Sequence, residues 1–78
     1  MLTTYIRKAM NKAHYELLED GTIYGAIANC PGVWSNSQTL EECREELQSV
    51  LEGWLILKLR DRDPIPEIDG LSLSAEVA

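Results

Sequence analysis

Four glutamates lie close together in the middle of the chain: Glu41, Glu42, Glu45 and Glu46. Carboxylates perform acid–base chemistry in glycosidases and hold metal ions in nucleases, provided that they converge on a pocket. Here they occupy the first two turns of a predicted helix, where negative charge complements the positive end of the helix dipole. A solvated helix face therefore explains them better than a metal site does.

The other side chains that could act as nucleophiles or metal ligands are Cys30, Cys43 and His14. A Cys–His nucleophile needs a third group that orients the histidine and an oxyanion site, and the sequence offers neither. The two cysteines lack the spacing of zinc ligands and are too few for a disulfide framework. The glycines are scattered rather than gathered in a phosphate-binding loop. We expect no catalytic residue, no metal and no cofactor, and hence a protein that is not an enzyme.

Length and charge limit the function further. Seventy-eight residues predict one domain, 1–78, with a small core. The net charge of −6 disfavours a general binder of nucleic acid or anionic membranes, because phosphate contacts need clustered Lys and Arg. The longest apolar run, WLIL at 54–57, is too short to span a bilayer, and the first residues do not resemble a signal peptide. We expect a cytoplasmic, reduced protein.

The periodicity of apolar residues divides the chain into four parts. Residues 1–12 predict a short basic helix, and residues 14–37 predict a three-stranded antiparallel sheet. Residues 39–60 predict the main helix, and residues 61–78 an extended tail or a short strand. The predicted fold class is therefore α+β, in the order α-β-β-β-α with a possible short fourth strand and with the helices on one face of the sheet.

Local motifs mark the boundaries of these elements. An Asp-Gly pair at 20–21 is typical of a tight type I′ hairpin turn, and a Pro-Gly pair at 31–32 ends the second strand. Thr39 and Glu42 have the spacing of a capping box, in which each side chain satisfies an unpaired backbone N–H of the other residue.

The apolar residues of the main helix predict two apolar surfaces. Apolar residues that alternate steps of three and four predict one buried seam, formed by Leu40, Cys43, Leu47, Val50, Trp54 and Leu57. Beyond this seam, the last turns are apolar nearly all round, which a small domain cannot bury. We therefore expect a second contact surface, for a twin subunit or another partner, formed by Trp54, Leu55, Ile56 and Leu59.

The order of the motifs carries a family resemblance. Five motifs follow one another over most of the chain. They are an acidic-Gly turn at 19–21, the Pro-Gly pair, Ser35, a T-L-E-E helix start at 39–42 and P-I-P at 64–66. In this order they resemble the HicB-like antitoxins, which are partners of small HicA-type RNA-cleaving toxins. The resemblance implies a double-stranded-RNA-binding-like or degenerate RNase H-like unit without catalysis. It also implies an inhibitor that covers a toxin's active site and forms a homodimer or homotetramer.

The chain departs from this family in two respects. Many relatives carry glycine where Ser37 stands. Many also continue into a helix-turn-helix or ribbon-helix-helix domain that binds their own operator, whereas this sequence ends at Ala78. We therefore expect no direct DNA binding.

The first hypothesis is an antitoxin that binds a small basic toxin and no membrane. Tyr24 and Trp34 are the predicted contact anchors, because exposed aromatic residues are common at interfaces. Glu41, Glu45 and Glu46 are the predicted steering charges, because complementary charge speeds encounter with a basic partner. The simpler interpretation, which we favour for the tryptophan, is that Trp34 packs on the main helix.

Two other hypotheses stay open. One is a self-associating orphan domain without a toxin, in which the apolar end of the main helix explains dimerisation. The other is an RNA-binding module that uses the basic first helix through Arg7, Lys8 and Lys12. The acidic majority of the chain disfavours this third hypothesis.

Overall fold

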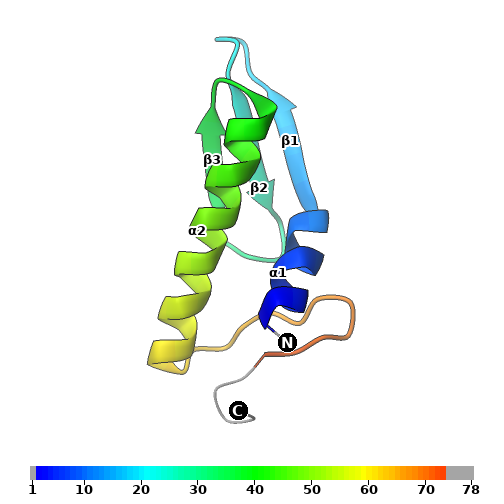
Figure 1. Ribbon diagram of the computed structural model, residues 1–78, viewed down its shortest axis with the longest axis vertical. Coiled ribbons are helices and arrows are strands. Elements are labelled where there is room, and N and C mark those ends of the chain that lie inside the picture. Colours follow the sequence, from blue (N-terminus) through cyan, green and yellow to red (C-terminus); the bar gives the residue numbers. More distant parts are fainter. Residues whose placement is uncertain (1, 74–78) are drawn as a thin grey trace.

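A computed structural model describes residues 2–73 of the chain. Three strands form one antiparallel sheet in the order β1-β2-β3, and the long second helix lies along one of its faces (Figure 1). The predicted α+β class and element order are confirmed. The elements are α1 (Leu2–Asn11), β1 (Ala13–Leu17), β2 (Ile23–Ile27), β3 (Trp34–Ser37) and α2 (Leu40–Asp61).

The hairpin between β1 and β2 exists, but its turn is not of the predicted type I′. The carbonyl of Leu18 accepts a hydrogen bond from the N–H of Gly21, and the N–H of Leu18 donates to the carbonyl of Thr22. Within the loop, only Gly21 has a positive φ, at 87°. This is a type I turn followed by a glycine bulge. The Asp20 carboxylate accepts hydrogen bonds from the N–H (3.0 Å) and hydroxyl (2.6 Å) of Thr22, so Asp20 stabilises the loop through its side chain rather than through a left-handed backbone.

The buried stripe of α2 differs from the predicted seam. Val50 and Leu57 are 39% and 50% exposed, whereas Leu51 and Leu55 are almost completely buried. The buried residues follow steps of four, which rotate the stripe by about 40° at each step. The rotation occurs because the first half of α2 packs on the sheet and the second half packs on α1 and the C-terminal segment. The stripe consists of Cys43, Leu47, Leu51 and Leu55.

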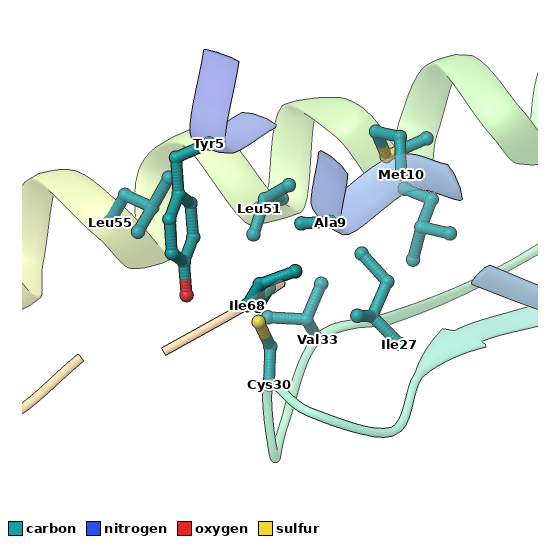
Figure 2. Close-up of a cluster of buried hydrophobic side chains, with 10 residues drawn as sticks. Tyr5, Ala9, Met10, Ile27, Cys30, Val33, Leu51, Leu55 and Ile68 are labelled. Atoms are coloured by element: carbon teal, nitrogen blue, oxygen red, sulfur yellow. The ribbon is translucent and has the colours of Figure 1, made fainter. Parts of the chain in front are cut away.

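The C-terminal segment, predicted as an extended tail, is part of the core. Figure 2 shows side chains from α1, α2, the β2–β3 region and this segment converging on one cluster. Ile68 is 1% exposed within it. Ile68 and Leu71 form an isolated bridge around Asp69 and Gly70, both of which have positive φ. The possible fourth strand reaches into residues 74–78, which lie outside the described residues.

The start of α2 confirms the predicted cap, with one difference in detail. The N–H of Glu42 donates to the Thr39 hydroxyl at 3.1 Å, as a capping box requires. The same hydroxyl donates to the Glu42 carboxylate at 3.0 Å. The reciprocal contact therefore joins the two side chains, rather than the carboxylate and the backbone N–H of Thr39.

Candidate interaction surface

Helix α2 packs closely against one face of the sheet, and its contacts show which side chains of each strand point toward it. The Ser35 hydroxyl donates to the carbonyl of Cys43 at 2.8 Å and lies 3.2 Å from its thiol. A Cβ atom at Gly25 would lie 3.0 Å from the Cys43 Sγ and 3.0 Å from the Tyr15 ring. Glycine and serine therefore let the helix pack closely on β2 and β3. Tyr15, Gly25 and Ser35 mark the inner face.

The opposite face of the sheet is covered by neither helix. Side chains alternate between the two faces of a strand, so the neighbours of the inner residues point away from α2. We call these six residues the outer face. The strand register places Glu16, Tyr24 and Asn36 in one row across the sheet, and His14, Ala26 and Trp34 in the next.

Two aromatic side chains dominate the outer face. Trp34 is 55% exposed and Tyr24 is 36% exposed. Their rings are stacked, with centroids 6.1 Å apart and planes inclined by 26°. The interpretation that Trp34 packs on the main helix is wrong, because Val33 and Ser35 take the inward positions on either side of it. Trp34 and Tyr24 are thus exposed together, as contact anchors would be.

The predicted steering charges lie on the other side of the molecule. Glu41, Glu45 and Glu46 are exposed on α2, which packs on the inner face of the sheet. Glu46 also accepts a hydrogen bond from the Ser37 hydroxyl at 3.1 Å. The five residues predicted for partner binding therefore form two separate surfaces rather than one. Sequence reasoning missed Glu16, which lies beside Tyr24 in the register; the alternation of β1 was the available signal.

The structure places the four residues predicted for an oligomer interface in different environments. Leu55 is 1% exposed because it packs against α1, so its side chain is not available to a second subunit. Trp54 is partly buried, and the Lys58 Nζ lies 5.5 Å from the centroid of its ring. Ile56, in contrast, is 63% exposed. Leu59 is half-buried.

An apolar groove of about 260 Å³ lies between α1 and the second half of α2. Leu55 forms its floor, and Ile56 and Leu59 line it on the α2 side. Leu2 and Ile6 line it on the α1 side. Sequence reasoning found the α2 side of this groove and missed the α1 side, because the two helices meet only in the folded chain.

The possible nucleophiles are in positions that favour packing over chemistry. Cys30 and Cys43 are free thiols, and both are completely buried. Burial raises the pKa of the Cys30 thiol, and hydrogen bonding with the Tyr5 hydroxyl opposes this increase only in part. A thiol with a raised pKa stays protonated at neutral pH and is a poor nucleophile.

Within residues 2–73, no three His, Cys, Asp or Glu side chains are grouped closely enough to hold a metal ion. None of the helices in this part of the chain has the length and hydropathy needed to cross a bilayer. The Glu45 region of α2 contributes only a shallow polar depression, shared with Gln48, Ser49 and Glu52.

Comparisons with known proteins agree with this picture of a small α+β unit. The model of the UPF0150-like family matches residues 4–66. Among solved structures, the crystal structure of TTHA0281 from Thermus thermophilus is similar to the chain, with a TM-score of 0.88 and 38% sequence identity. The alignment covers 94% of this chain and 91% of TTHA0281. No curated protein matches the chain.

Proposed function

Because the chain belongs to the UPF0150-like family, a small family associated with toxin–antitoxin systems, we propose that it is a HicB-like antitoxin. In this proposal it binds and neutralises a small, basic, HicA-type RNA-cleaving toxin and performs no catalysis itself. The observation that carries the proposal is the family match over residues 4–66, which includes the hairpin, the Pro-Gly turn and the capped helix.

The character of the molecular surface supports this function. An inhibitor needs a surface that a partner can cover, and the outer face provides one with two exposed aromatic residues. A toxin that cleaves RNA presents positive charge to its substrate, and a protein with a net charge of −6 attracts such a surface. Glu41, Glu45 and Glu46 add to this long-range attraction from the opposite side.

The proposal includes a cytoplasmic location. Both cysteines are buried as free thiols and neither forms a disulfide, which is the usual state in a reducing compartment. A toxin that cleaves cellular RNA acts in the same compartment, so its inhibitor must be there as well.

Co-expression with the product of the adjacent reading frame tests the proposal. We expect the two proteins to elute as one complex in size-exclusion chromatography and the chain to suppress RNA cleavage by its neighbour. Pancreatic ribonuclease, another small basic enzyme, serves as the control that the chain must fail to inhibit. Separate elution together with undiminished RNA cleavage would rule out the antitoxin function.

A second candidate function, self-association, is favoured by the groove between α1 and α2. Ile56 and Leu2 are exposed at its rim, and a second copy could bury both. Ile56→Glu should shift the sedimentation coefficient toward that of a monomer. Val50→Glu is the matched control, because Val50 is exposed on the same helix outside the groove. An oligomer that tolerates Ile56→Glu would exclude the groove as its interface.

A further inference from the structure

We infer that the outer face is the docking surface for the basic partner and that it receives an arginine side chain on the stacked rings of Trp34 and Tyr24. The inference rests on the proposed function, which supplies a basic protein as the partner. The outer face of the sheet makes the direct contact with the partner. The glutamates of α2 attract the partner from a distance.

The aromatic pair forms a platform that needs no rearrangement to bind. A centroid separation of 6.1 Å lies within the range of favourable aromatic pairs. Both rings stand on regular strands, which hold side chains more firmly than loops do. Asn36 strengthens the same edge, because its Nδ2 donates to the Thr22 hydroxyl at 2.9 Å and to the Ile23 carbonyl at 3.0 Å. A platform fixed in advance loses little conformational entropy when a partner covers it.

The charge beside the platform selects a cation. Glu16 is the direct cross-strand neighbour of Tyr24, and such neighbours have Cβ atoms about 4.5–5.5 Å apart. All seven Lys and Arg residues of the chain lie outside the three strands, so no Lys or Arg of the outer face competes with an incoming cation. Glu19 and Asp20 extend the negative charge into the adjoining hairpin loop.

The combination favours arginine over lysine. A guanidinium group can stack flat on an aromatic ring and still donate hydrogen bonds in its plane to a carboxylate. The ammonium group of lysine is a strongly hydrated point charge without a stacking surface. The other tryptophan of the chain, Trp54, already has a cation on its ring, because the Lys58 Nζ lies 5.5 Å from the ring centroid. Trp34 has an aromatic neighbour instead.

The α2 glutamates fit a docking role less well. In the described part of the chain the stacked aromatic pair lies on the outer face and not beside these glutamates, and Glu46 already accepts a hydrogen bond from Ser37. Exposed charges without an apolar anchor change association rates more than they change affinity. Binding energy concentrates instead at tryptophan, tyrosine and arginine contacts.

Calorimetry on the complex with the adjacent-frame protein tests the surface. We expect Trp34→Ala to weaken binding at least tenfold and Trp34→Phe to restore part of the loss, because a phenyl ring keeps a stacking face. Glu16→Gln should weaken binding severalfold. Val50→Ser, at an exposed position of α2 outside both the outer face and the groove, is the matched control and should bind like the wild type. Wild-type affinity in Trp34→Ala would overturn the docking surface while leaving the antitoxin function intact.

A second measurement tests the surface without the toxin. An Arg-Gly-Arg-Gly-Arg peptide, titrated into the labelled chain, should shift the indole N–H resonance of Trp34 and not that of Trp54. The lysine analogue of the peptide should need a severalfold higher concentration. Equal responses to both peptides, or shifts confined to Glu41 and Glu45, would contradict the inference. If the arginine peptide binds at Trp34 but the adjacent-frame protein does not bind at all, the proposed function fails and the docking chemistry stands.

Discussion

The hydroxyl of Tyr5 donates a 2.6 Å hydrogen bond to the carbonyl of Pro66, 61 residues further along the chain. This bond joins α1 to the C-terminal segment beside the buried side chain of Ile68. An ion pair joins the same two parts of the chain at the surface, where 2.9 Å separates the Lys12 Nζ from the Asp69 Oδ1. The exposed ion pair contributes little stability, so the partly buried bond of Tyr5 is the stronger of the two links.

Tyr5→Phe removes that bond and keeps the ring. We expect it to lower the free energy of unfolding by about 1 kcal/mol, because the Pro66 carbonyl loses its partner in a partly buried position. This corresponds to a decrease of roughly 4–8 °C in Tm for a domain of this size. Tyr24→Phe is the control, since the Tyr24 ring lies on the exposed outer face. Equal melting temperatures for wild type and Tyr5→Phe would mean that the C-terminal segment is held by apolar packing alone.

The same substitution at two glycines should have opposite effects. Gly25→Ala places a Cβ atom 3.0 Å from the Cys43 Sγ, and overpacking of this kind costs about 1–3 kcal/mol. Gly53→Ala meets nothing within 4 Å in the exposed middle of α2, and should stabilise the helix by up to about 1 kcal/mol. Urea denaturation of both variants measures the two changes. A stable Gly25→Ala would show that α2 can move away from the sheet at little cost.

The features that the sequence predicted correctly depend on neighbours in the chain. The cap at Thr39 and Glu42 and the hairpin around Gly21 need only a few adjacent residues, so their motifs were sufficient. The turn type was wrong because the contact of the Asp20 side chain with Thr22 competes with the backbone conformation that an Asp-Gly pair usually adopts.

The features that the sequence did not predict depend on which elements meet. Leu51 rather than Val50 is buried because α1 and the C-terminal segment lie on that side of α2, and no helical pattern contains this information. The apolar residues on either side of Asp69 and Gly70 were a usable sign that the C-terminal segment folds back. The face of Trp34 was predicted wrongly because its neighbour Ser35 points inward. A polar residue was not expected in that buried position, so the larger tryptophan was assigned to it instead.

The end of α2 contains a residue in an unfavourable conformation. Arg62 has φ and ψ of 57° and 32°, in the left-handed region that glycine adopts without cost. The N–H of Asp63 donates to the carbonyl of Lys58 at 2.9 Å, so this conformation closes the helix. Arg62→Gly should therefore raise the free energy of unfolding by about 0.5–1 kcal/mol. Arg60→Gly, two residues earlier and inside the helix, should lower it by about 1 kcal/mol. Thermal melts of the pair check the sign, and a loss of stability in Arg62→Gly would refute the argument.

The hairpin loop should respond to acid through Asp20. Hydrogen bonds from the hydroxyl and N–H of Thr22 hold the pKa of the Asp20 carboxyl below its usual value. A carboxyl whose pKa is lower in the folded chain stabilises the fold above its unfolded pKa, which is about 3.9, and loses this contribution as the pH falls through the folded pKa. Asp20→Asn should therefore lower Tm at pH 7, and the difference from wild type should shrink as the pH falls below the unfolded pKa of about 3.9. Glu19→Gln changes the net charge equally in the same loop and is the matched control. A difference between Asp20→Asn and wild type that stays constant from about pH 7 to about pH 2.5 would mean that the carboxylate charge does not stabilise this turn.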